Sequence, residues 1–86
     1  MSYYAGDWCV SVEGTEQRFF TINADGSVII YGDPTTITIP STDITKNSDT
    51  SYTYYDNAGN SMNFNFTSDT KGIVVEGDTA FNVTKK

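Results

Sequence analysis

The sequence predicts an all-β protein, a small antiparallel meander of about eight short strands rolled into a compact barrel. Of its 86 residues, 38 are Val, Ile, Thr, Phe, Tyr or Trp, whereas 15 are the strong helix formers Ala, Glu, Lys, Gln, Met or Arg, and leucine is absent. Branched and aromatic side chains fit a pleated sheet and lose rotamer freedom in a helix. Apolar residues also alternate with polar ones along most of the chain, between closely spaced turn sequences.

Four strands are expected in the first half of the chain, at residues 7–13, 17–23, 27–31 and 35–39. The turn at residues 23–26 ends in Asp25-Gly26, a pair that readily supplies the positive φ of a tight hairpin. Both faces of residues 27–31 are apolar, which indicates a central strand. A Gly-Asp-Pro break at residues 32–34 follows it. Pro40 ends the fourth strand because proline has no amide hydrogen to donate.

Four more strands are expected in the second half, at residues 50–55, 61–67, 73–76 and 79–84. Before them, residues 40–49 are polar except for Ile44, which leaves open a loop, a short edge strand or a helical turn. Turns are expected at residues 56–60, 68–72 and 77–78. Such short connections force neighbouring strands to be antiparallel. The strands then form one domain of residues 1–86, either a barrel or, alternatively, a two-sheet β-sandwich.

Period-two alternation also predicts which side chains point into the core. The expected inward set is Trp8, Val10, Val12, Phe20, Ile22, Val28, Ile30, Ile37, Ile39, Tyr52, Tyr54, Met62, Phe64, Phe66, Ile73, Val75, Phe81 and Val83. The interior of a barrel of about eight strands is just wide enough for side chains to fill. These bulky residues therefore argue against an internal cavity for a small molecule.

The net charge of −6, from 11 acidic and 5 basic residues, bounds the choice of partner. Nucleic-acid binding needs a basic face to displace counterions, and anionic membrane surfaces attract the same kind of face. Neither partner is expected. Residues 1–5 lack the basic start and apolar stretch of a signal peptide, and no apolar run has the length of a membrane span. We therefore expect a cytoplasmic or virion-associated protein.

Few residues offer catalytic or metal-binding chemistry. The chain has no histidine, which removes the commonest general base and metal ligand. The lone Cys9 has no predicted basic neighbour to lower its pKa, so it is read as a packing residue. Counting an EF-hand loop around Gly26 puts Gly32 where the last ligand, a glutamate, is required. No enzyme activity, cofactor or metal site is expected, and a carboxylate-based hydrolase is the weakest alternative.

One local motif resembles known families. Gly6 and Trp8, spaced Gly-x-Trp on the first expected strand ahead of an antiparallel meander, resemble lipocalin-type and avidin-type barrels. The resemblance covers two residues and the general topology, and the chain is shorter than members of those families usually are. It implies the alternative function, a small ligand-binding lipocalin-like barrel.

Surplus aromatic and apolar residues favour protein binding instead. Tyrosine is enriched at protein interfaces because it offers rigid area with a polar tip. The expected docking surface, made of residues that the inward face does not need, is Tyr3, Tyr4, Phe19, Ile29, Tyr31, Tyr55 and Val74. The leading hypothesis is a non-enzymatic acidic module that docks another protein or self-associates. A phage- or virus-type accessory or structural protein and a small inhibitor are concrete versions.

Overall fold

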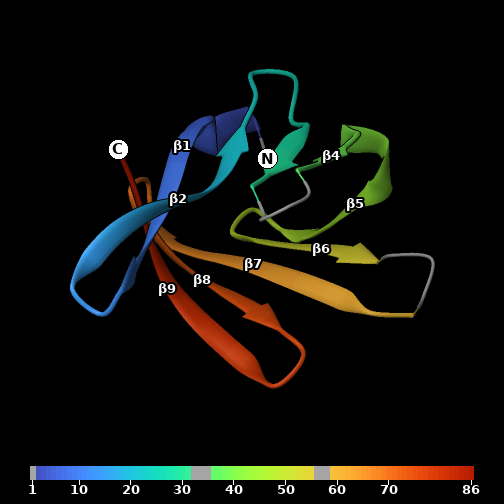
Figure 1. Cartoon of the computed structure of the whole chain (residues 1–86). Coiled ribbons are helices and arrows are strands. Elements are labelled where there is room, and N and C mark those ends of the chain that lie inside the picture. The colour runs from blue at the N-terminus through green and yellow to red at the C-terminus, as the bar shows by residue number, and fades with distance from the viewer. Residues whose placement is uncertain (1, 32–35, 56–58) are drawn as a thin grey trace.

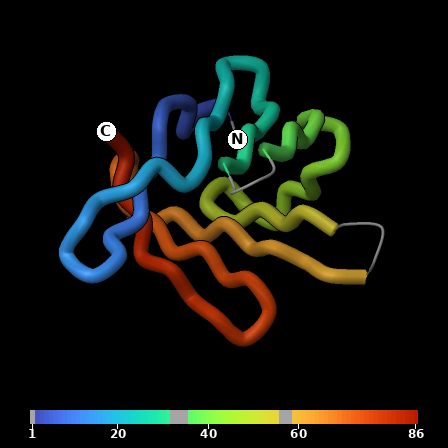
Figure 2. The backbone as a smooth tube through the Cα atoms, in the orientation of Figure 1, coloured from blue at the N-terminus to red at the C-terminus, as the bar shows by residue number. Residues whose placement is uncertain are grey.

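The computed structural model describes residues 2–31, 36–55 and 59–86, and its strands form one antiparallel sheet (Figure 1). The strands are β1 (Gly6–Val12), β2 (Thr15–Ile22), β3 (Val28–Ile30), β4 (Ile37–Ile39), β5 (Ile44–Ser48), β6 (Ser51–Tyr55), β7 (Ser61–Ser68), β8 (Lys71–Glu76) and β9 (Thr79–Lys85). Two short 3-10 turns accompany them, η1 (Ser2–Tyr4) and η2 (Ser41–Asp43). The predicted meander is confirmed, and the sheet curls into a nearly closed barrel (Figure 2).

Strands β4 and β5 lie at the two edges of the sheet, whose order is β4-β3-β2-β1-β9-β8-β7-β6-β5. Because every neighbour is antiparallel, directions alternate across the sheet, and β4 and β5 run the same way. Pro40 and η2 connect them directly. They therefore act as one interrupted strand that pairs first with β3 and then with β6. In this way the barrel keeps an even number of strand positions, as an antiparallel ring requires.

The segment left open by the sequence contains both a turn and a strand. Residues 41–43 form η2, with the Asp43 amide donating to the Pro40 carbonyl at 3.0 Å, and β5 follows at once. The hairpin predicted at residues 23–26 is confirmed: Gly26 has φ +90°, and the Asn23 amide donates to the Ser27 carbonyl at 2.8 Å. The predicted break at 32–34 and residues 56–58 of the predicted turn at 56–60 lie outside the described residues.

The predicted inward face of β8 is wrong by one residue. Ile73 is 36% exposed and Val75 is half-buried, whereas Gly72 and Val74 are buried. The hairpin pairs Ser68 with Lys71 at its turn, but a bulge shifts the register so that Phe66 lies opposite Gly72. A one-residue slip turns every side chain of a strand to the other face. Further bulges occur in the β1–β2 and β5–β6 pairs, and bulges increase the twist that a small barrel needs.

Aromatic side chains form the centre of the core. Trp8, Phe20 and Phe64 are completely buried, with Trp8 stacked on Phe20 at a centroid distance of 5.9 Å and Phe64 edge-on to Phe20 at 5.2 Å. Each buried aromatic removes on the order of 150–250 Å² from water, which is a large contribution in a chain this short. Most of the predicted inward set is buried or half-buried. Val12, 43% exposed, and Ile37, 50% exposed, are the further exceptions.

Candidate functional site

One end of the barrel is closed by the first residues of the chain. Tyr4, in η1, stacks on Phe66 with a centroid distance of 3.9 Å and an interplanar angle of 10°. The Trp8 Nε1 group donates a hydrogen bond of 2.9 Å to the Tyr4 carbonyl oxygen. Tyr52 lies edge-on to Phe66 at 6.1 Å and completes this aromatic layer. We call this the plugged end, because backbone and aromatic rings cover the core here.

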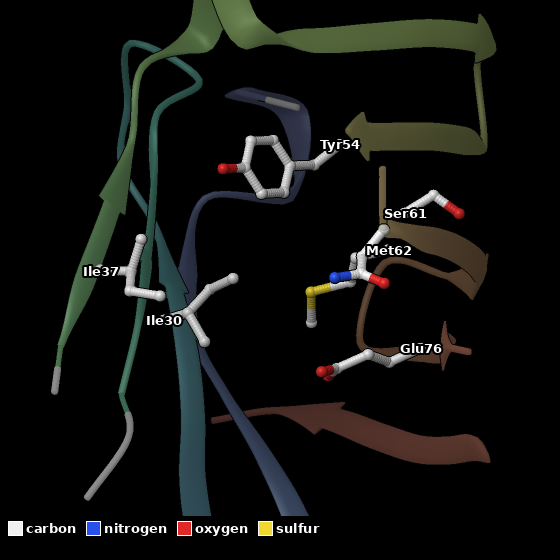
Figure 3. Close-up of a pocket in the computed structure, with 7 residues that line it drawn as sticks. Ile30, Ile37, Tyr54, Ser61, Met62 and Glu76 are labelled. Atoms are coloured by element: carbon white, nitrogen blue, oxygen red, sulfur yellow. The ribbon is translucent and has the colours of Figure 1, made fainter. Parts of the chain in front are cut away.

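The opposite end is open and holds a small apolar cavity of about 150 Å³. Figure 3 shows Ile30 and Ile37 on one wall, facing Tyr54, Met62 and Glu76 on the other. All these residues lie at or near strand ends on one side of the barrel, as strand directions require. Asn60 and Ser61 complete the lining. We call this cavity and its rim the open end.

The walls of the open end are apolar side chains that remain in contact with solvent. Ile37 is 50% exposed, although it begins a strand and packs beside Ile30, its direct partner across β3 and β4. Ile30 and Tyr54 are half-buried, and Met62 forms the more deeply buried part of the wall. Period-two alternation predicts these four residues in the core and does not indicate that they line an opening. Strand-end position is the signal that was available for this.

Glu76 was missed because of the β8 register. In the observed register it lies opposite Met62, so its side chain extends from the end of β8 toward the cavity (Figure 3). The predicted phase of β8 put this carboxylate on the outer face. No basic side chain of the described residues forms an ion pair with Glu76. An apolar wall and one carboxylate therefore meet at the same opening.

Charges are distributed unevenly along the barrel axis. The turns at the open end carry Glu13 and Asp78 in addition to Glu76 at the end of β8. All basic residues of the chain lie elsewhere: Arg18 within β2, Lys46 within β5, and Lys71, Lys85 and Lys86 at the plugged end. Lys46 pairs with Asp49 at 3.2 Å, and Lys86 pairs with Glu16 at 2.8 Å. Glu76 is therefore the acidic side chain that lines the cavity, and Glu13 and Asp78 add negative charge in the turns at this end of the strands.

The predicted docking surface does not form one continuous patch. Tyr4 and Val74 are 5% and 1% exposed, so their assignment to an outer surface is wrong. Tyr4 belongs to the plug, and Val74 turns inward because of the bulge between β7 and β8. Tyr3 and Tyr55 are exposed, at 69% and 63%, but Tyr3 lies at the plugged end and Tyr55 at the open end.

Phe19 and Ile29 are both half-buried, in different surroundings. Phe19 is the additional residue of the β1–β2 bulge and lies edge-on to both Phe20 and Phe81 at 5.5 Å, so it packs against the core. Ile29 lies on the outer wall, opposite Thr21 and Thr38. Phe19 therefore supports the barrel interior, and a docking role for Ile29 stays a prediction.

Tyr31, also half-buried, belongs to an intramolecular network on the outer wall of β1–β3. The Thr21 hydroxyl donates to an Asp7 carboxylate oxygen at 2.7 Å and lies 2.9 Å from the Tyr31 hydroxyl. The Arg18 guanidinium lies over the Tyr31 ring, 5.2 Å from its centroid, a cation–π arrangement. These contacts hold Tyr31 against its own barrel.

The described residues place little reactive chemistry at the surface. Cys9 is 6% exposed, and burial, followed by the negative charge of Glu16, raises the pKa of its thiol. A raised pKa keeps the sulfur in its less nucleophilic thiol form. Within residues 2–31, 36–55 and 59–86, no group of three or more Cys, Asp or Glu side chains is arranged to hold a metal ion.

Both free sheet edges are short or irregular. β4 has three residues and ends at Pro40, while β5 carries Lys46 and a bulge before Ser48. Short strands, lysine and bulges are the devices that protect sheet edges from pairing with another chain. The edges are therefore poor sites for strand addition, and the open end is the stronger candidate for binding.

Comparison with protein families, curated proteins and solved structures found no match to this chain. In the part of the chain that the structure describes, no helix has the length and apolar character needed to cross a membrane. The function of the candidate site is therefore inferred from its geometry and charge.

Proposed function

We propose that the protein is a non-enzymatic binding module whose open end receives an apolar group of a partner protein. The observation that carries this proposal is the cavity of about 150 Å³ with Ile37, half exposed, on its rim. Burying apolar area contributes roughly 25 cal/mol per Å², so a partner that covers these walls and removes them from water gains binding free energy. This proposal keeps the predicted protein-docking function but assigns it to the residues of the open end instead of the predicted outer surface.

The open end supports a protein partner over a small-molecule ligand, because its apolar cavity is small and the hollow of about 520 Å³ beside it is lined by polar side chains and glycine. Pockets that enclose a ligand usually measure about 300–1,000 Å³. A cavity of about 150 Å³ accepts one side chain, while the exposed rim, with Ile37 and Tyr55, offers further contact area. The lipocalin-like alternative would need an interior that the rings of Trp8, Phe20 and Phe64 already fill.

Charge argues for a different protein rather than self-association through the open ends. Two copies meeting cavity to cavity would bring the Glu76 carboxylates of both chains together, in two molecules that each carry a net charge of −6, and like charges repel. A cytoplasmic or virion-associated location stays a prediction from sequence. An accessory, structural or inhibitory role is compatible with docking by one end of the barrel.

Selection from a random peptide library, followed by affinity measurement on variants, tests the proposal. We expect enriched peptides to bind Ile37→Asp at least about tenfold more weakly than the wild type, because a charge then occupies the apolar rim. Tyr3→Ser, at the plugged end, is the matched control and should bind as the wild type does. Trp8 fluorescence verifies that both variants fold. Equal affinity for Ile37→Asp and the wild type, or an absence of enriched peptides, would contradict the proposal.

A further inference from the structure

Glu76 gives the open end a chemical preference. Its carboxylate extends toward a cavity whose other walls include Ile30, Ile37, Met62 and the Tyr54 ring (Figure 3). An alkyl chain that ends in a positive charge matches this arrangement, because the chain covers the apolar walls while its charge approaches the carboxylate.

We infer that the open end binds a lysine side chain of a basic partner protein, with the lysine stem against the apolar walls and its ammonium group at Glu76. This inference rests on the proposed docking function and names the chemistry of the partner. Lysine carries a compact charge on a flexible four-carbon stem, whereas arginine ends in a broad planar group. The narrow cavity favours the lysine stem. Glu13 and Asp78 at the same end attract a basic partner and repel acidic ones.

A second copy of this chain is a poor source of that lysine. Its net charge is −6, and its own basic side chains are largely engaged. Lys46 and Lys86 form ion pairs, Arg18 lies over Tyr31, and the stem of Lys85 packs against Gly6. Among the described residues, the ammonium groups of Lys71 and Lys85 form no ion pair, and overall repulsion between two acidic molecules opposes the approach of either. The occupant is therefore assigned to a different, positively charged protein.

Three probes of equal chain length separate charge from apolar contact. We would titrate the protein with n-pentylammonium, n-pentanol and pentanoate and follow the methyl NMR signals of Ile30, Ile37 and Met62. The ammonium ion should bind about fivefold more tightly than the alcohol, the upper range for an exposed ion pair. Pentanoate should produce no saturable shift. Equal binding of the ammonium and the alcohol would overturn the lysine inference while leaving apolar docking intact.

Two protein variants assign the preference to one carboxylate. Glu76→Gln removes the charge with little change in shape, and it should bring the affinities for pentylammonium and pentanol within about twofold. Asp43→Asn, which removes an exposed charge in η2 that does not line the cavity, is the matched control and should keep the difference. If Glu76→Gln retains the full preference, or if Asp43→Asn abolishes it, the assignment to Glu76 is wrong.

Peptides from the library distinguish the possible sources of the cation. Norleucine keeps the alkyl stem of lysine and lacks its charge. Replacing the lysine of an enriched peptide by norleucine should therefore lower the affinity about fivefold. The loss should disappear on Glu76→Gln. Enriched peptides without an essential lysine would overturn the inference. The inference is also overturned if none of the enriched peptides displaces pentylammonium, because the site then binds a free amine. It is overturned too if sedimentation depends on concentration and Lys71→Ala or Lys85→Ala abolishes this dependence, because the occupant is then a second copy.

Discussion

Gly72 shows how a residue without a side chain lets two strands approach closely beside a bulge. A Cβ atom at this position would lie 2.9 Å from the Asn65 carbonyl oxygen and 3.2 Å from the Phe66 ring. Glycine lets β8 pass close to β7 just beyond the bulge, and this bulge turns Val74 inward and Glu76 toward the cavity. The carboxylate of the candidate site thus depends on a small residue four positions earlier.

We predict that Gly72→Ala destabilises the fold by about 1–3 kcal/mol, the range for overpacking a tight interior. The added methyl group meets backbone on one side, and backbone cannot rotate away as a flexible side chain can. Urea denaturation followed by Trp8 fluorescence gives the free energy of unfolding. Ser11→Ala, at an exposed position of β1, is the control and should change it by well under 1 kcal/mol. An unchanged midpoint for Gly72→Ala would contradict the described β7–β8 contact.

Asp25 makes the stability of the turn between β2 and β3 depend on pH. The Ser27 hydroxyl donates to its carboxylate at 2.6 Å and the Ser27 amide at 2.9 Å, and these bonds lower the pKa of Asp25 below its ordinary value of 3.8. A lowered pKa in the folded state contributes stability above the unfolded pKa, and this contribution is lost as pH falls through the folded pKa.

The wild type should therefore be more stable than Asp25→Ala at pH 7, and the difference should shrink as the pH is lowered below 3.8. Thermal unfolding at a series of pH values measures this difference directly. Asp78→Ala, in the exposed turn between β8 and β9, serves as a comparison. A gap between wild type and Asp25→Ala that widens toward acidic pH would have the wrong sign and would contradict the role of Ser27.

Among the elements, the long alternating strands were predictable, whereas the short ones and the bulges were not. Met62, Phe64 and Phe66 alternate with polar residues, and β7 buries these three side chains as predicted. β5 contains one half-buried apolar residue, Ile44, and therefore has no alternating pattern that predicts a strand. Its pairing with β6 makes it a strand. The β7–β8 bulge has no marker in local alternation, and the phase of β8 was accordingly wrong.

The element that closes the barrel, η1, was also invisible to periodicity, because a single turn has no repeat. We predict that Tyr4→Ala costs about 3–4 kcal/mol, since it removes the ring stacked on Phe66 and opens the core at the plugged end. Trp8 is the single tryptophan of the sequence, and its emission should shift to longer wavelength as water approaches. Denaturation and fluorescence spectra report both effects.

Tyr3→Ala is the matched control for this change, because the two tyrosines are adjacent and differ in burial. The Tyr3 side chain is 69% exposed, and its hydroxyl donates to Asp69 at the surface at 2.9 Å. Its replacement should change stability by less than about 1 kcal/mol and leave Trp8 emission in place. If the two variants behave alike, η1 does not form the plug described for it.

At the scale of the whole molecule, the difference between the two barrel ends is the property that sequence alone did not reveal. Composition and alternation were sufficient for an all-β meander, and the aromatic residues for a filled interior. The open end depends on which strand ends meet around the barrel, and Ile37 and Glu76 lie far apart in the chain. Their meeting follows from β4 and β5 sharing one position in the ring.

The most direct measurement is a methyl NMR map of the protein bound to an enriched peptide. We predict saturable shifts at Ile30, Ile37 and Met62, which line the open end, with little change at Ile29 and Ile73 on the outer wall. Shifts centred on Ile29 or Ile73, with the signals of Ile37 and Met62 unmoved, would place binding on the outer wall. That result would contradict binding at the open end.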